Sequence, residues 1–351
     1  MSQTNQDIIV QADSLRKFAS ALYQKAGIGQ EHAELMADLQ VETDLRNVHS
    51  HGTRMIPWYI GSILKGDMNP TPDIRVIQEG LGFAVIDGGN GLGHPPCALA
   101  MRMAIEKARA TGIAAAGVRN AGHFGAAACY AMMAAEEKMI GFSTTNTGGP
   151  SVAAPGSAQA VTANNPLSYA LPAGEERPIV LDMACGASSW GKVRTLTMYG
   201  KPIPPGWLLT EDGKPTEDAS EGKILTPAGG PRGYGLALIM GILAGPLVGG
   251  LMACHKHHDE PSEHFFIAIN VSSFTKFDEY ATEIDRAIHT VHASKTAEGV
   301  DQVYLPGEIE WRKREAWIAS GIPLHIDHLH DLANVAEKLG VEICWEWQKT
   351  E

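Results

Sequence analysis

Two histidines in short, glycine-bordered segments are the residues best suited to chemistry. His51 lies in the triplet Ser50-His51-Gly52, and His123 lies in the segment Arg-Asn-Ala-Gly-His-Phe-Gly at 119–125. Imidazole accepts and donates protons near neutral pH, and a neighbouring hydroxyl such as that of Ser50 can fix its tautomer. A lone histidine is more often a core or solvated residue, so a catalytic role for either histidine must be judged from the surrounding segments.

Each histidine is expected just before a helix. The pattern predicts one helix from about Ser50 or His51 toward Leu64, with Pro57 in its path, and another over Ala126–Lys138. The positive end of a helix dipole would lower the pKa of His51 and ease proton donation. A bound carboxylate would act in the opposite direction.

The other predicted elements place helices at both ends and a β-rich middle between them. Asp13 is expected to cap a helix that runs to Lys25. Further helices are expected over residues 31–45, 97–110, 309–320 and 330–339, and strands over 83–87 and 265–269. Residues 234–250 are apolar throughout but are interrupted by Pro246, which favours a buried core helix over a membrane span.

Length and composition are typical of a packed soluble protein. The 351 residues can form two or three core-bearing lobes, and 44% are hydrophobic. A net charge of −12 argues against nucleic-acid binding, so an anionic substrate needs local Arg or Lys. Five scattered cysteines without a CxxC pair favour reduced thiols, and the N-terminus lacks a signal-peptide pattern. We therefore expect a cytoplasmic protein with no membrane or nucleic-acid partner.

Several short motifs occur in one order along nearly the whole chain. After the two histidine segments come Ile-Gly-x-x-x-Thr-Asn at 140–146, Asn-Pro at 165–166 and Val-Leu-Asp-Met-Ala at 180–184. Later landmarks are 201–207, 229–238 and Leu-Pro-Gly-Glu at 305–308. This set resembles the malate/L-lactate dehydrogenase type 2 family, which includes ureidoglycolate, sulfolactate, 2,3-diketogulonate and piperideine-2-carboxylate oxidoreductases.

The resemblance implies an α/β fold. Its centre is a mixed, largely antiparallel sheet that binds nicotinamide and is not a Rossmann fold, joined by a helical lobe from both chain ends. We expect segments 1–80, 81–300 and 301–351 to be the N-terminal helical part, the cofactor-binding domain and the C-terminal helical part. The motif GxGxxG does not occur, so the glycines of 88–93 are interpreted as turn residues.

The implied activity is hydride transfer between NAD or NADP and C2 of a small 2-hydroxy or 2-oxo acid. Alternatives are reduction of a cyclic imino acid or of a keto-sugar acid. His51, with Ser50 beside it, is expected to donate the proton. His123 is the second candidate for that role, or a contact to substrate or nicotinamide.

Cofactor and substrate contacts are also implied by the resemblance. The expected cofactor-binding residues are Asp182, Met183, Ala184, Arg232, Pro306, Gly307 and Glu308, although Asp182 could be structural. Relatives carry Lys where this chain has Arg232, and Gly-Thr-Asn-Pro where it has 163–166. Their substrate arginine follows the histidine by four residues, whereas Arg54 follows His51 by three and Met55 holds the usual position. Both spacings can share a helix face, so Arg54 is expected to bind the carboxylate.

Three further features allow more than one interpretation. Arg194 could contact a 2′-phosphate or be a surface residue. Histidine-rich segments at 254–264 and 325–331 match no defined zinc spacing, so no metal is expected. The different-class alternative is a metal-binding or scaffolding relative without dehydrogenase activity, against which the retained Ser50, His51 and His123 argue.

The resemblance implies a homodimer. Five tryptophans lie outside the β-rich middle and could be interface anchors or could pack the helical lobe: Trp58, Trp311, Trp317, Trp345 and Trp347.

Overall fold

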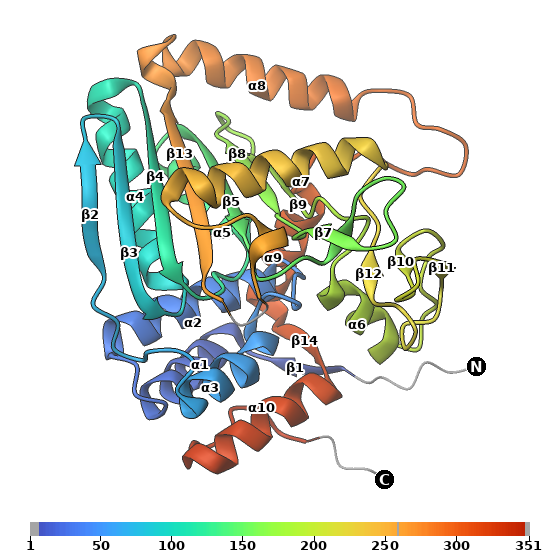
Figure 1. Cartoon of the computed structure of the whole chain (residues 1–351). Helices are drawn as coiled ribbons and strands as arrows, with labels where there is room; N and C mark the ends of the chain where they lie inside the picture. The colour runs from blue at the N-terminus through green and yellow to red at the C-terminus, as the bar shows by residue number, and fades with distance from the viewer. Residues whose placement is uncertain (1–6, 258–259, 348–351) are drawn as a thin grey trace.

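A seven-stranded mixed sheet forms the centre of the computed structural model, which describes residues 7–257 and 260–347 (Figure 1). In spatial order its strands are β2 (Arg75–Gly80), β3 (Phe83–Gly91), β4 (Ile113–Ala121), β13 (Ser262–Asn270), β5 (Met139–Asn146), β8 (Leu167–Leu171) and β9 (Ile179–Met183). The pair β3–β4 is parallel, and the other neighbouring pairs are antiparallel. The predicted mixed α/β fold is confirmed.

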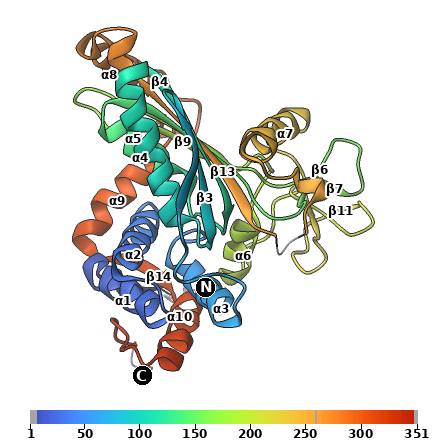
Figure 2. The ribbon, with the colours of Figure 1, turned by 60° about the vertical axis from the view of Figure 1, so that its left-hand side comes forward.

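Helices cover both faces of this sheet (Figure 2). Helices α4 (His94–Thr111) and α5 (Ala127–Glu136) pack on one face, and α7 (Pro231–Ala244) packs on the other. Small residues allow the close approach of α5, because a Cβ on Gly141 of β5 would come within 2.1 Å of the Ala131 carbonyl oxygen. Helix α8 (Phe277–His292) follows β13 along the chain.

The two ends of the chain share one hydrophobic core. Strand β1 (Asp7–Val10) pairs antiparallel with β14 (Ile322–His325). The helices on this core are α1 (Ala12–Lys25), α2 (Gln30–Leu45), α3 (Ile56–Lys65) and α10 (Ile326–Leu339), and α9 (Glu308–Ser320) contacts α2. Leu22, Leu45, Ile60 and Leu332 lie fully buried between them. Strand β2 belongs to the central sheet, so the expected boundary at residue 80 lies too late.

A second, five-stranded sheet was not expected. Its order is β11 (Pro215–Thr216), β10 (Leu208–Leu209), β12 (Ile224–Leu225), β6 (Val152–Ala153) and β7 (Ala160–Thr162). Val193 of α6 (Trp190–Met198) packs into its small core. Strands of two or three residues are too short to show a periodic pattern in the sequence.

Several expected helix starts are wrong: α4 begins at His94 and α10 at Ile326, three and four residues before their expected starts. Gln11 precedes α1, so Asp13 lies in the first turn, where it faces the positive dipole end without capping the helix. Helix α3 begins at Ile56 after a 3₁₀ turn, Thr53–Met55, and Pro57 fits its first turn because that position needs no N–H donor.

Helix α7 is only half buried, which corrects the expectation of a fully buried helix. Gly233, Ala237, Gly241 and Ala244 face the sheet, whereas Leu236, Ile239 and Ile242 are exposed. By length and composition alone Pro231–Val248 could cross a membrane. Its small-residue face packs against β5 and β13.

Candidate active site

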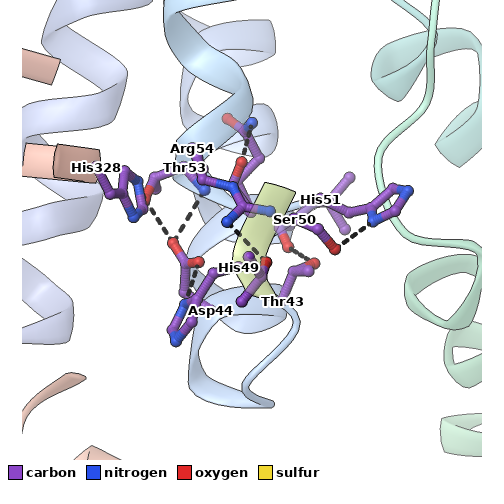
Figure 3. A network of polar contacts seen from close by, with 12 residues as sticks. Thr43, Asp44, His49, Ser50, His51, Thr53, Arg54 and His328 are labelled. Carbon is purple, nitrogen blue, oxygen red and sulfur yellow. Dashed lines mark hydrogen bonds and ion pairs between the residues drawn. The ribbon is translucent and has the colours of Figure 1, made fainter. Parts of the chain in front are cut away.

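A buried carboxylate fixes the turn that carries His51 (Figure 3). Asp44, near the end of α2, accepts hydrogen bonds from Thr53 N (2.9 Å), Thr53 Oγ1 (2.6 Å) and His49 Nδ1 (2.9 Å). Burial alone would raise the pKa of Asp44, but these bonds and the nearby histidines hold it below its usual value. A Cβ on Gly52 would lie 2.2 Å from Asp44 Oδ1, so this turn requires glycine.

Two more elements support the same turn. Gln40 Nε2 of α2 donates to the Gly52 carbonyl oxygen at 3.0 Å. His328 of α10 lies with its Nε2 3.2 Å from Thr53 Oγ1. The position of His51 therefore depends on helices from both ends of the chain.

His51 and His123 lie beside each other, with ring centroids 5.6 Å apart. Ser50 Oγ is 2.9 Å from His51 Nδ1. Burial, with a smaller contribution from the Arg54 charge, lowers the pKa of His51 to about 4. The expected lowering is present, but its main cause is burial and not a helix dipole, because α3 begins only at Ile56.

The tautomer of neutral His123 follows from its neighbours. Gly125 N–H donates to His123 Nδ1 at 3.1 Å, and Tyr59 Oη lies 2.6 Å from the same atom. Burial raises the pKa of Tyr59 far above its usual value, so the phenol stays protonated and donates a hydrogen bond to His123 Nδ1. Nδ1 is then an acceptor, and the ring proton must be on Nε2.

Both histidines line a cavity of about 710 Å³. Asp182, Met183 and Ala184, at the end of β9, line it too. One face of α6 and its two caps form another wall, whose residues are spaced three or four apart: Ser189, Lys192, Thr195, Leu196 and Tyr199. Lys313 and Trp317 of α9 also line the cavity. Ser189 also caps α6, accepting from Lys192 N.

Arg54 does not line this cavity. Its Nη2 donates to the Gly191 carbonyl oxygen at 2.8 Å, and its Nη1 donates to Thr195 Oγ1 at 2.9 Å. Arg54 therefore anchors α6 from behind, which differs from the direct carboxylate contact expected from the sequence. The cations on the cavity wall are Lys192, Lys201 and Lys313.

The other expected cofactor residues are spread over a wider area. Pro306 and Gly307 line a neighbouring cavity of about 200 Å³, which Asp182 also lines. Glu308 is ion-paired with Arg312, and its Oε2 lies 2.9 Å from His292 Nε2. Arg232 is exposed in the first turn of α7, outside both cavities. Arg194 is exposed and paired with Asp331 at 2.8 Å.

The histidine-rich segments have structural roles where the structure describes them. His264 is buried against the Phe124 ring, with Nε2 3.1 Å from the Gly122 carbonyl oxygen. His325 caps α10, and His330 stacks on Trp347. Positions 258 and 259 of the first segment lie outside the described residues. Within the described ranges no group of three His, Cys, Asp or Glu side chains could hold a metal ion.

Sequence reasoning missed Tyr59 and the α6 wall. Tyr59 has the spacing of a core residue, since it lies one turn before Ile63 in α3, and nothing marked it as a partner of His123. The spacing of Ser189, Lys192 and Thr195 could have indicated one polar helix face.

Comparisons with known proteins agree with this architecture. The malate/L-lactate dehydrogenase family matches residues 10–333. A malate dehydrogenase from Pyrococcus abyssi is 36% identical over 344 residues, covering 94% of this chain and 94% of the relative. An NAD(+) ureidoglycolate dehydrogenase from Escherichia coli strain K12 is 30% identical over 307 residues, covering 86% of this chain and 88% of the relative.

A solved structure gives the same result. Sulfolactate dehydrogenase from Methanocaldococcus jannaschii superposes with a TM-score of 0.87 at 32% identity, covering 95% of this chain and 98% of the other. A Δ1-pyrroline-2-carboxylate/Δ1-piperideine-2-carboxylate reductase from Pseudomonas putida is 27% identical over 330 residues, covering 91% of this chain and 94% of the relative. The chain belongs to the malate/L-lactate dehydrogenase family.

Proposed function

We propose that this protein is a nicotinamide-dependent 2-hydroxyacid dehydrogenase acting on a small malate- or sulfolactate-like acid. The observation that carries the proposal is the pair His51–His123 on one cavity with the end of β9. A cavity of about 710 Å³ next to a second one fits an elongated dinucleotide together with a small acid. The bound nicotinamide supplies or accepts the hydride, and NAD or NADP can serve.

His51 is the proposed acid/base residue. Its pKa of about 4 leaves the ring neutral at pH 7, ready to accept the proton of a substrate hydroxyl during oxidation. In the reductive direction the protonated ring returns that proton to the carbonyl oxygen. Ser50 holds the ring through Nδ1, so Nε2 is the atom that exchanges the proton.

His123 is proposed as a neutral hydrogen-bond donor. Protonation of Nδ1 would place two hydrogen-bond donors face to face, because the backbone N–H of Gly125 points at this atom and cannot rotate. Its Nε2–H is therefore available to orient the substrate oxygen, while its own proton is not transferred. Tyr59 is a positioning residue that holds this tautomer.

Lys192 is proposed to bind the substrate carboxylate, with Lys201 as a second cation. Both line the cavity on the side of α6. Arg54 supports this site indirectly, because it fixes Gly191 and Thr195 on either side of Lys192. The substrate alternatives, a cyclic imino acid or a keto-sugar acid, would use the same cation for their carboxylate.

A substrate panel tests the proposal. Purified protein is offered oxaloacetate, pyruvate, a 2-oxo-3-sulfonate, a 2,3-diketo sugar acid and a cyclic imino acid, each with NADH and with NADPH, while nicotinamide absorbance is followed. We expect turnover of at least one 2-oxo acid. Failure of all substrates, with no change in nicotinamide fluorescence on titration, would favour the metal-binding or scaffolding alternative.

The proposal extends to location and assembly. All five cysteines are free thiols, which supports a reducing compartment such as the cytoplasm. A homodimer remains our proposal. Three of the five tryptophans have partners within the chain: Trp345 packs in the core of the terminal lobe, Trp317 stacks on His49, and Trp311 Nε1 donates to the Pro178 carbonyl oxygen. Trp58 and Trp347 are exposed and could still be interface anchors.

A further inference from the structure

One fully buried histidine makes no hydrogen bond and has no part in the proposed reaction. His94 is the first residue of α4, and both of its ring nitrogens are enclosed without a hydrogen-bond partner among residues 7–257 and 260–347. Burial lowers its pKa to about 3, so the ring is neutral at pH 7. An enclosed imidazole without hydrogen bonds costs free energy, so any role of His94 must follow from what its ring packs against.

The edge of the His94 ring packs against Gly125. A Cβ on Gly125 would lie 2.8 Å from His94 Nε2 and 3.4 Å from His94 Cδ2. Gly125 has a φ of +80°, in the region that favours glycine, and its N–H donates to His123 Nδ1 at 3.1 Å. His94 therefore supports the backbone of the first donor to His123 Nδ1.

The same ring contacts the second donor. The rings of His94 and Tyr59 are nearly perpendicular, at 85°, with centroids 5.4 Å apart. This edge-to-face arrangement is a favourable one for aromatic rings. Tyr59 Oη lies 2.6 Å from His123 Nδ1. His94 thus contacts both residues whose donors fix the tautomer of His123.

The start of α4 also holds the backbone of the turn that carries His123. Gly93 N donates to the His123 carbonyl oxygen at 3.0 Å. A Cβ on Gly93 would lie 2.4 Å from the Gly122 carbonyl oxygen, so helix and turn approach each other closely. Helix α4 packs along β3, β4 and β13, which makes it a rigid support. A side chain on such a support locates its neighbours more precisely than one on a loop.

Other buried side chains hold different atoms of this turn. His264 Nε2 lies 3.1 Å from the Gly122 carbonyl oxygen, and Tyr130 Oη donates to the Phe124 carbonyl oxygen at 2.5 Å. These two bonds fix the main chain of the turn. His94, in contrast, packs on the two residues that donate to the His123 ring.

We propose that His94 is a positioning residue that holds the Gly125 N–H and Tyr59 Oη on His123 Nδ1 and thereby keeps the ring proton of His123 on Nε2. The inference rests on the proposed function, in which this Nε2–H orients the substrate oxygen. His94 acts through His123, because it does not itself line the cavity.

Nitrogen NMR of the histidine rings tests the inference without turnover, because the ¹⁵N shifts of a neutral imidazole show which nitrogen carries the proton. At pH 7 we expect the His123 proton on Nε2 in the wild type and a mixture of both tautomers in His94→Leu. Gln places a planar amide near the position of His94 Nε2, so His94→Gln should recover the wild-type tautomer. His123→Gln assigns the signals.

Kinetics and stability together separate positioning from a merely structural role. We expect His94→Leu to lower kcat about tenfold, the value of one neutral hydrogen bond, with KM for the acid changed less. Its urea midpoint should equal or exceed that of the wild type, because two unpartnered nitrogens are removed. Phe266→Leu is the matched control: Phe266 is fully buried in the core beside α4, so its loss should lower the midpoint and leave kcat within twofold.

The inference is overturned if the His123 tautomer or kcat is unchanged in a folded His94→Leu variant. A wild-type His123 with its proton on Nδ1, or an equal loss of kcat in Phe266→Leu, would also overturn it. His94→Met, with an unbranched side chain, gives the same comparison if His94→Leu does not fold. Absence of turnover by the wild type with every substrate would instead overturn the proposed function, and the tautomer measurement would still apply to His94.

Discussion

At the scale of single residues, the two histidines of the proposed active site differ in what their Nδ1 atoms contact. His51 Nδ1 meets a hydroxyl, which can donate or accept, so its ring can change protonation state without a clash. His123 Nδ1 meets a backbone N–H, which can only donate. One residue can therefore cycle a proton, and the other is held as a neutral donor.

Replacement of His51 should remove proton transfer and spare cofactor binding. His51→Ala is expected to lower turnover about 10²–10⁴-fold, the usual contribution of a general acid or base, with little change in NADH affinity. His123→Ala should cost less, about 10- to 100-fold. Steady-state kinetics and a fluorescence titration provide both values. Near-wild-type turnover in His51→Ala would move the acid/base role to His123 or elsewhere.

The pH dependence should report the low pKa of His51. Oxidation needs the neutral ring, so kcat/KM for the 2-hydroxy acid should stay flat from pH 8 down past 6.5 and fall only as pH approaches about 4. Reduction needs the protonated ring, so its kcat/KM should fall about tenfold per pH unit above that pKa. An oxidation profile with its acid limb at pH 6.5 or above would contradict the lowered pKa of His51.

At the scale of elements, the strongest sequence signals were periodic ones. Both ends of α2 and α9 lie within one residue of the ranges that the apolar spacing predicts, whereas α10 begins four residues before its predicted start. The five-stranded sheet is not predicted because its strands are very short. The α6 wall is not predicted because α6 buries only Val193. Tyr59 could not be assigned, since its partner is 64 residues away and only the fold joins them.

The α6 wall distinguishes direct from indirect carboxylate recognition. Lys192→Met should raise KM for the acid about 10- to 100-fold through loss of a charged hydrogen bond, with kcat changed less. Arg54→Met should also raise KM, because α6 loses its anchor at Gly191 and Thr195.

The exposed Lys338 on α10 gives a control, and Lys338→Met should leave KM unchanged. If KM rises in Arg54→Met and stays constant in Lys192→Met, Arg54 itself contacts the carboxylate.

At the scale of the whole molecule, stability should depend on buried neutral histidines. Burial lowers the pKa of His51 to about 4 and the pKa values of His94, His264 and His328 to about 3. An unfolded histidine binds a proton near pH 6.5, so between pH 6.5 and about 4 only the unfolded state is protonated. The free energy of unfolding must then fall as pH falls through this window.

Urea denaturation at pH 7, 6 and 5 measures this effect. Each group should cost on the order of 2 kcal/mol at pH 5. The carboxyl groups of Asp182, Glu136 and Glu263, whose pKa values burial raises, act with the opposite sign. The histidines with lowered pKa values outnumber them, because the pKa of His123 is lowered as well. His264→Gln should reduce the slope. A free energy of unfolding that stays constant from pH 7 to 5 would show that these histidines take up protons in the folded state.

The exposed apolar face of α7 offers a surface for the proposed homodimer. Leu236, Ile239 and Ile242 are 39%, 51% and 43% exposed, a pattern enriched at interfaces. Light scattering should give about twice 37.5 kDa for the wild type. Ile239→Glu should shift the mass toward one chain if this face is buried in the dimer, and a wild-type mass near 37.5 kDa would exclude the dimer.

The pairing of β1 with β14 ties catalysis to the order of synthesis. The turn that carries His51 leaves the ribosome early, but His328, which supports it through Thr53, is among the last residues made. The central sheet can form first, while α1, α2 and α3 wait for the end of the chain to complete their core. Contacts of such long sequence separation form slowly. A chain that ends between Pro323 and His328 would thus carry every cavity-lining residue and still lack the contact from His328 to the turn that holds His51.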